Sequence, residues 1–167
     1  MAAGTFVQSE DGGSKLTENA LEELEKYLNQ NQAQKEAMIQ KKKILVVDDS
    51  EFMLKAMQQL LGDHYEILTA TSGLSAFRSI TLDRPDLILL DYEMPVCEGS
   101  QVLEMIRSEK EFADIPVIFL TSRVDRESVK KVVELKPQGY LSKSLSPELI
   151  KKEVNQFFEK NKSASAG

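Results

Sequence analysis

The 167-residue chain has room for one ordinary domain and an appendage, and its hydrophobic content of 41% is enough to build a core. Its formal net charge of -6 argues against direct binding of nucleic acid, because contacts to the phosphate backbone need clustered lysine and arginine. The single cysteine, Cys97, excludes an internal disulfide and a zinc site made of cysteine thiolates alone.

The first predicted element is a helix that precedes the main domain. Residues 1–16 are small, polar and glycine-rich, so we expect them to be disordered or loosely docked. Residues 17–42 are expected to be a helical extension or linker, with Thr17 as the N-cap. One face of this helix carries leucines, namely Leu21, Leu24 and Leu28. The stripe is short for a coiled coil, so a docked helix, a linker from an upstream region and a dimerising helix all stay open.

From residue 43 to residue 161, short β-branched apolar runs alternate with amphipathic stretches of helical length. The apolar runs predict five strands, at Ile44–Val47, Tyr65–Ala70, Leu87–Leu90, Pro116–Thr121 and Gly139–Ser142. Helices are predicted at Glu51–Leu61, Leu74–Leu82, Ser100–Ser108, Arg126–Leu135 and from Pro147, with Ser146 as the cap of the last. Continuous apolar runs suit strands buried on both faces, so the pattern predicts an open parallel sheet between two layers of helices. Residues 162–167 are expected to be a flexible tail.

Polar side chains follow most of these predicted strands. In open parallel sheets, ligands bind beyond the carboxyl ends of the strands. The residues at those ends are Asp48 and Asp49 after the first strand, Asp91 after the third, Thr121 on the fourth and Lys143 after the fifth. One aspartate after a strand is usually a helix cap, but the convergence of these groups indicates a site.

The chemistry of this cluster follows from its charges. Three neighbouring carboxylates repel one another unless a cation relieves the repulsion, and Mg²⁺ is the natural choice for oxygen ligands at an open site. Magnesium also favours phosphate oxygens. The cluster therefore indicates phosphoryl chemistry, with Asp91 as the nucleophile and with Lys143 and Thr121 opposite the metal.

Four motifs in order, VVDDS, LLDYEMPVCEG, VIFLTS and YLSK, are similar to those of a known family. From Lys43 to Asn161 the chain resembles the receiver domain of bacterial two-component response regulators. The resemblance implies an α/β, flavodoxin-like, doubly wound sheet with the strand order 2-1-3-4-5. This order agrees with the fold expected from the pattern of strands and helices.

The resemblance also implies roles for the residues at the strand ends. Asp91 is expected to accept a phosphoryl group from the phosphohistidine of a sensor kinase or a histidine phosphotransfer protein. Asp49 is expected to hold Mg²⁺ directly and Asp48 largely through water, with Asp91 and the backbone carbonyl of Glu93 as further ligands. Lys143 is expected to pair with Asp91 and, after phosphorylation, with the phosphoryl oxygens.

A switch and an output surface are implied as well. Thr121 is expected to move towards the phosphoryl group, and Tyr140 to turn inward as it does so. The surface of the domain's fourth helix, fifth strand and fifth helix is then expected to bind a downstream protein or an attached domain. Homodimerisation stays open, as does the choice between a stand-alone receiver and the C-terminal part of a larger protein.

Two positions depart from the family pattern. Ser144 follows the lysine where most receivers have proline, so we predict a trans Lys143–Ser144 bond, because a cis peptide without proline costs about 2.5 to 4 kcal/mol. Arg123 stands near Thr121, where it is placed to cover the site or to contact Glu93. Either arrangement is expected to change how readily water reaches the acyl phosphate.

The resemblance implies a phosphoacceptor signalling domain rather than a conventional enzyme, because a receiver catalyses only its own phosphorylation and slow dephosphorylation. Two other functions are the alternatives. One is a pseudo-receiver that signals without phosphate, which the intact set of site residues disfavours. Another is a haloacid-dehalogenase-like phosphohydrolase, which needs a D-x-D element that VVDDSEF lacks. Without a signal-peptide core or an apolar stretch long enough for a bilayer, the chain is expected to be cytoplasmic with no membrane partner.

Overall fold

The computed structural model describes the backbone of residues 13–166 and the side chains of residues 18–32 and 41–161. The chain divides into two units after Lys41. The described part of the first unit contains helix α2 (Gly13–Gln40). The second holds, in chain order, β1 (Lys43–Val47), α3 (Glu51–Leu61), β2 (Glu66–Ala70), α4 (Gly73–Leu82), β3 (Leu87–Leu90), α5 (Gly99–Ser108), β4 (Val117–Thr121), α6 (Arg126–Val133), β5 (Gly139–Ser142) and α7 (Pro147–Ala166).

Helix α2 is longer than the sequence pattern predicted. It begins at Gly13, so Thr17 lies inside the helix and the prediction that Thr17 is its N-cap is wrong. Lysine and leucine, the residues just before Thr17, are good helix formers, so nothing there opposes an earlier start. The three leucines of the predicted face are about half exposed within this helix. The three alternatives for its role, docked helix, linker or dimerising helix, all remain open.

The five strands form one parallel sheet with the order β2-β1-β3-β4-β5, as predicted. The predicted strands and helices of this unit are all present, and their ends differ by only a few residues. Helix α6 ends at Val133 rather than at Leu135. Shortly after this end Lys136 adopts a left-handed conformation with φ 54°, which a right-handed helix cannot contain. Helix α7 runs on to Ala166, into the segment expected to be a flexible tail.

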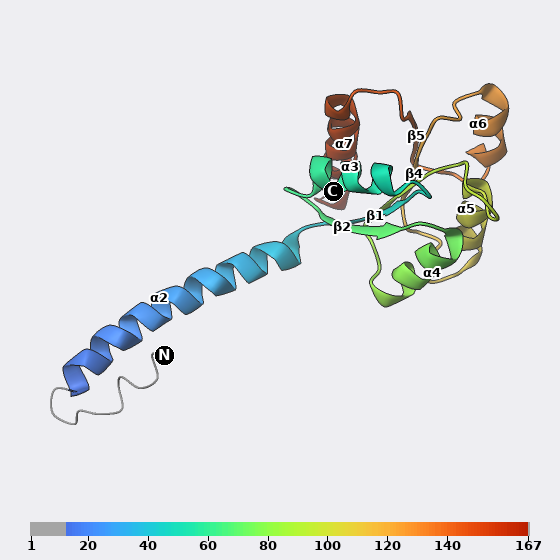
Figure 1. Ribbon diagram of the computed structural model, residues 1–167. Helices are drawn as coiled ribbons and strands as arrows, with labels where there is room; N and C mark the ends of the chain where they lie inside the picture. The colour runs from blue at the N-terminus through green and yellow to red at the C-terminus, as the bar shows by residue number, and fades with distance from the viewer. Residues whose placement is uncertain (1–12, 167) are drawn as a thin grey trace. The chain divides into compact units, whose positions relative to one another are not determined.

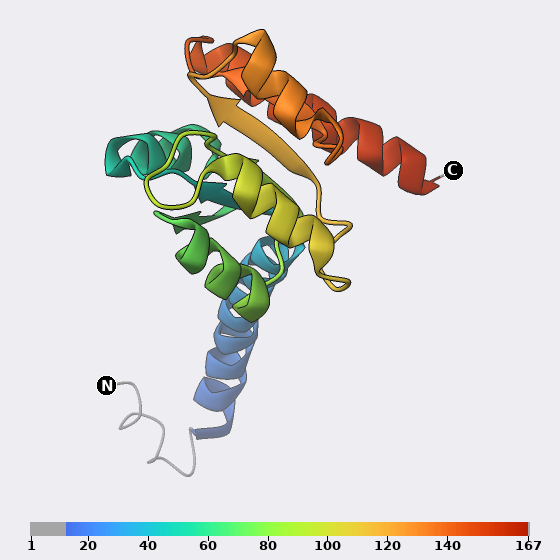
Figure 2. The same cartoon turned by 90° about the vertical axis from the view of Figure 1, so that its right-hand side faces the viewer.

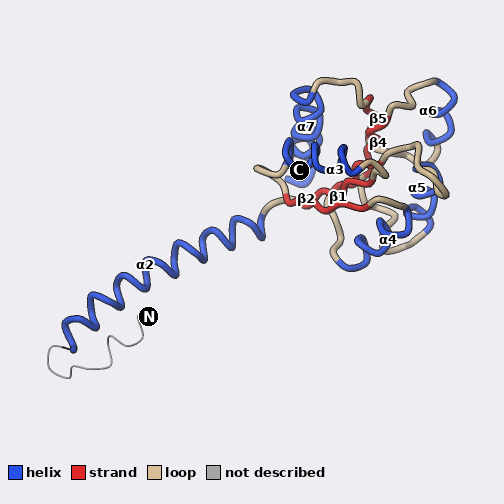
Figure 3. The backbone as a smooth tube through the Cα atoms, viewed as in Figure 1, coloured by secondary structure: helices blue, strands red, loops and turns tan. Residues whose placement is uncertain are grey.

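Helices cover both faces of the sheet (Figure 1). A hydrophobic cluster lies beneath the helices on each face. Side chains alternate along β1, so Leu45 and Val47 join the cluster under α4, α5 and α6, while Ile44 and Val46 join the cluster under α3 and α7. Helices α4 and α5 lie side by side over their face (Figure 2). Every residue of β3 is buried, as expected for a central strand covered on both sides. Figure 3 shows the strands of the sheet with helices around them.

Arg107, a half-buried residue near the end of α5, holds together two loops at the amino ends of the strands. Its guanidinium donates hydrogen bonds to oxygens of the α5–β4 and α6–β5 loops: the carbonyls of Ala113, Ile115, Leu135 and Lys136, and the side chain of Gln138. The shortest is 2.8 Å, to Ile115. Burial lowers the pKa of Arg107, but these oxygens stabilise the charge. The loops opposite the predicted site are therefore fixed by a single side chain.

No helix in the part of the chain that the structure describes combines the length and the apolar character needed to cross a membrane. Residues 13–16 form the start of α2, so the expectation of disorder is wrong for them. The rest of that expectation concerns residues 1–12, which lie outside the described residues, as does residue 167. The side chains of residues 162–166 also lie outside the described part of the chain.

Candidate phosphoacceptor site

The structure brings the predicted carboxylates together at the carboxyl edge of the sheet. Asp48 and Asp49 follow β1, and Asp91 follows the adjacent strand β3. Each carboxyl group offers an oxygen, and these oxygens all lie within 4.8 Å of one another. Asp48 and Asp91 are buried, whereas Asp49 is exposed. Oxygen donors at this spacing fit a hard divalent cation, because its charge would offset their mutual repulsion.

Lys143, directly after β5, reaches across to the buried carboxylates. Its Nζ lies 2.7 Å from Oδ2 of Asp48 and 3.2 Å from Oδ2 of Asp91. Burial lowers the pKa of Lys143, but its hydrogen bond to Asp48 and the charges of both carboxylates outweigh this, so the pKa is raised. Burial raises the pKa of Asp48, and the hydrogen bond from Lys143 opposes the rise. The pairing with Asp91 was expected, but the shorter contact with Asp48 was not.

These groups line an open pocket of about 510 Å³. Its wall consists of residues from four strand-end loops: Asp48, Asp49, Ser50, Asp91, Glu93, Met94, Pro95, Ser122 and Lys143. The pocket is large enough for a phosphoryl group and its donor atom, and Asp91 belongs to its wall although only 3% of that residue is exposed. The pocket therefore gives access to a carboxylate that is otherwise buried.

Local structure fixes the position of each carboxylate. Oδ1 of Asp48 accepts a hydrogen bond of 2.9 Å from the backbone of Ser50, whose own side chain caps α3. The backbone of Asp91 continues the sheet by donating to the carbonyl of Val47. Gly99, the first residue of α5, lies against that same segment, and a Cβ there would stand 2.2 Å from the carbonyl oxygen of Asp91. The first turn of α5 therefore holds Asp91 in place, provided that residue 99 has no side chain.

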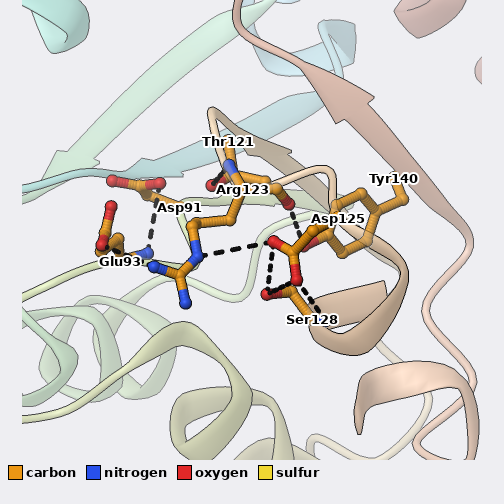
Figure 4. Close-up of polar contacts among 7 residues, drawn as sticks. All are labelled: Asp91, Glu93, Thr121, Arg123, Asp125, Ser128 and Tyr140. Atoms are coloured by element: carbon orange, nitrogen blue, oxygen red, sulfur yellow. Dashed lines mark hydrogen bonds and ion pairs between the residues drawn. The ribbon is translucent and has the colours of Figure 1, made fainter. Parts of the chain in front are cut away.

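Thr121 and Tyr140 lie beside the pocket rather than in its wall (Figure 4). The hydroxyl of Thr121, a fully buried residue, accepts a hydrogen bond of 3.1 Å from the backbone of Arg123. The ring of Tyr140 is half-buried, with its centroid 5.2 Å from that of Phe119, and its hydroxyl donates to the carbonyl of Arg123. Burial raises the pKa of Tyr140 to about 12. Residue 123 thus joins both members of the predicted switch.

The side chain of Arg123 spans two loops at the mouth of the pocket (Figure 4). Nη1 lies 3.0 Å from Oε2 of Glu93, and Nε lies 3.6 Å from Oδ1 of Asp125. The guanidinium carbon stands 6.0 Å from the ring centroid of Tyr92. The predicted contact between Arg123 and Glu93 is therefore confirmed, whereas its effect on dephosphorylation stays a prediction.

The fold and this arrangement agree with what is known of one protein family. A family model described as the response regulator receiver domain matches residues 44–155. The chain belongs to the response regulator receiver family. The matched segment contains all of the strands except the first residue of β1, Lys43, and the whole of the pocket.

Relatives of this receiver include both large and small signalling proteins. The chain is 32% identical over 142 residues to the hybrid signal transduction histidine kinase D of Dictyostelium discoideum, which covers 84% of this chain and 9% of the kinase. It is 29% identical to the chemotaxis protein CheY-3 of Vibrio cholerae, which covers 75% of this chain and 98% of that protein. The chain spans only 51% of the regulatory protein PhoP of Bacillus subtilis. The solved structure of CheY4 of Vibrio cholerae has a TM-score of 0.66 at 28% identity, over 70% of this chain and 98% of that chain.

The receiver keeps a trans bond where its sequence departs from the family pattern. The Lys143–Ser144 peptide is trans, so that prediction is confirmed. The backbone of Ser144 donates to the hydroxyl of Ser142, and the two hydroxyls lie 2.6 Å apart. This local turn gives the loop after β5 its shape.

Several parts of the receiver site were missed by sequence reasoning. Ser122 lines the pocket, Tyr92 lies under Arg123, and Asp125 both caps α6 and pairs with Arg123. Val96 stands near the pocket with φ 71°, a conformation that costs a β-branched residue roughly 1 to 3 kcal/mol. The cap could have been found from the D-x-x-S spacing before α6, but the other features depend on the folded loops.

Proposed function

We propose that this chain is a phosphorylatable switch in which Asp91 accepts a phosphoryl group from the phosphohistidine of a sensor kinase or histidine phosphotransfer protein. The observation that carries the proposal is the convergence of the Asp48, Asp49 and Asp91 oxygens within 4.8 Å, with Lys143 in contact with two of them. Such a group of charges is costly to maintain for packing alone. It suits a site that receives a dianionic group together with a divalent cation.

In the transfer, a carboxylate oxygen of Asp91 forms a bond to phosphorus as the bond from phosphorus to the histidine nitrogen breaks. The electron pair of the broken bond stays on the imidazole, which leaves neutral once it holds a proton. Asp48, Asp49 and the backbone carbonyl of Glu93 would hold Mg²⁺, which supplies charge neutralisation for the phosphoryl oxygens. Lys143 would exchange its contact with Asp91 for one with the phosphoryl group.

The readout that we propose is a change in Thr121 and Tyr140. The hydroxyl of Thr121 would leave the backbone of Arg123 and donate to the phosphoryl group, and Tyr140 would change its position with it. This movement alters the surface made by α6, β5 and α7, through which a downstream protein or attached domain would respond. The relatives include a hybrid signal transduction histidine kinase and a chemotaxis protein, which supports a role in signalling. We place the activity in the cytoplasm.

Mass spectrometry provides the test. The protein is incubated with Mg²⁺ and phosphoramidate, and the intact mass is followed over time. We expect the wild-type chain to gain one phosphoryl group and Asp91→Asn to gain none. A folded wild-type chain without any gain would refute the proposal and favour a pseudo-receiver that binds partners without phosphate.

A further inference from the structure

Helix α2 carries an apolar stripe that stays exposed. Four large side chains form it, and between 52% and 61% of each is exposed: Leu21, Leu24, Tyr27 and Leu28. We call these residues the leucine stripe. In the described part of the first unit α2 is the one helix or strand, so no second element of that unit covers the stripe.

The length of α2 decides what such a stripe can do. The helix is continuous (Figure 1) and has 28 residues, or four heptads of seven, so it spans about 42 Å. This reaches the length of about three to four heptads that is typical of a coiled coil. Leu21, Leu24 and Leu28 have the spacing of the a, d and a positions of a heptad. The helix is therefore long enough to pair with a second helix along this stripe.

The two flanks of the leucine stripe differ in charge. At about 100° per residue, Glu18 and Glu25 lie along one flank, and Ala20 and Tyr27 along the other. In a parallel pair of identical helices, the acidic flank of each copy faces the uncharged flank of its partner. In an antiparallel pair, the two acidic flanks face each other and repel. The remaining charged residues of the described segment lie away from the stripe: Glu22, Glu23 and Lys26. The charge pattern thus suits a parallel pair.

The area of the stripe indicates how tight such a pair would be. Half of a large apolar side chain is on the order of 100 Å², so the four side chains expose roughly 400 Å². Two facing stripes would bury roughly 800 Å², and the stems of the flanking residues add to this, which gives a small but specific interface. Asn31 continues the row of Leu24 with a polar residue, which lowers the affinity. We therefore expect a dissociation constant on the order of 10 μM.

We propose that the leucine stripe is a dimerisation surface, and that it is covered by the same stripe of a second copy of this chain in parallel orientation. A second copy supplies both the apolar stripe and the uncharged flank that faces Glu18 and Glu25. Asp91 takes no part in this contact, so the dimer forms without a phosphoryl group, and the inference goes beyond the proposed function. A basic helix of another protein is the competing occupant, and it would leave the chain monomeric on its own.

Sedimentation velocity of the full chain, over a range of about 1 to 200 μM, measures the association. We expect the average mass to rise from one chain towards two, equally in wild type and in Asp91→Asn. Leu24→Glu places two carboxylates in the seam, so the dissociation constant should rise by about a hundredfold or more. Glutamate is a good helix former, so α2 stays helical, which circular dichroism checks. The matched control is Leu82→Glu on the exposed end of α4, which should stay within about twofold of wild type.

Disulfide crosslinking with oxidised glutathione tests the orientation. Positions 21 and 28 are about 10.5 Å apart along the helix, too far for one disulfide to span. In a parallel dimer, Leu21→Cys and Leu28→Cys each crosslink when present alone. In an antiparallel dimer about the centre of the stripe, crosslinks form only when the two variants are mixed. The control is Glu22→Cys, away from the stripe, and Cys97 is present in every variant, so any background from it is the same.

A wild-type chain that stays monomeric throughout the range would overturn the proposal, as expected if another protein or the chain itself covers the stripe. A dimer that persists in Leu24→Glu would overturn the leucine stripe as its surface. Crosslinks that form only in the mixture would overturn the parallel orientation. None of these results depends on phosphorylation, so they leave the proposed function to its own test.

Discussion

The contact between Gly99 and the backbone of Asp91 and Tyr92 gives the sharpest prediction. In Gly99→Ala, the new Cβ would stand 2.2 Å from the carbonyl oxygen of Asp91 and 2.8 Å from Cα of Tyr92. Both atoms belong to the backbone, so no side chain can turn aside, and α5 or the β3–α5 loop must move by about 1 Å. A backbone shift of this kind costs about 2 to 3 kcal/mol. We therefore expect a decrease in Tm of about 10 °C.

Thermal unfolding followed by circular dichroism measures this decrease. The matched control is Gly139→Ala in β5, whose Cβ would lie 3.4 Å from side-chain carbons of Ile118, an ordinary van der Waals distance. Its Tm is expected to stay within about 3 °C of wild type. Because the displaced backbone carries Asp91, labelling by phosphoramidate should also slow, by about a hundredfold for a shift of 1 Å. Equal Tm values for the two variants would refute the close-approach argument.

Val96→Asn is expected to raise the free energy of unfolding by roughly 1 kcal/mol, because asparagine adopts the left-handed conformation more readily than valine. Urea unfolding measures it, and a loss of stability would contradict the strain assigned to Val96. Arg123→Ala and Glu93→Ala should each shorten the lifetime of phosphorylated Asp91 about two- to fivefold, since their ion pair across the pocket mouth limits access of water. Unchanged rates of mass loss after donor removal would eliminate that role. The pKa of Tyr140 is about 12 in the folded chain and near 10 in the unfolded chain. The contribution of this group to the free energy of unfolding is therefore fully present below pH 10 and is lost as the pH rises to 12. After allowance for solvent exposure the loss is roughly 1 kcal/mol, and Tyr140→Phe should show a correspondingly flatter stability profile over this window; an identical slope would contradict the assignment.

The sheet was predictable because its apolar runs are continuous and evenly spaced. Burial on both faces leaves little choice of residue in a strand such as β3, so the sequence carries a strong signal. The positions of Asp48, Asp91 and Lys143 followed from this, since side chains at the ends of parallel strands share an edge. Their proximity is confirmed, while their roles stay predictions until phosphorylation is measured.

Other features depend on loop geometry, which short-range patterns do not encode. The second contact of Lys143, with Asp48, is decided by the path of the loop after β5. The φ of Val96 was not predictable, because valine disfavours the conformation that it adopts. The start of α2 was misjudged because a threonine before a leucine stripe is a sound cap signal, yet helix formers extend past it.

Arg107 has a consequence for how this chain tolerates substitution. Four of the five oxygens that its guanidinium contacts belong to the backbone, so they are available whatever side chains occupy those positions. The two loops are thus free to diverge in sequence over evolutionary time while their shape persists. The restraint is concentrated in one residue. An exchange at position 107 has no simple second-site remedy, because most of the oxygens that the guanidinium contacts are backbone carbonyls, which no substitution can change.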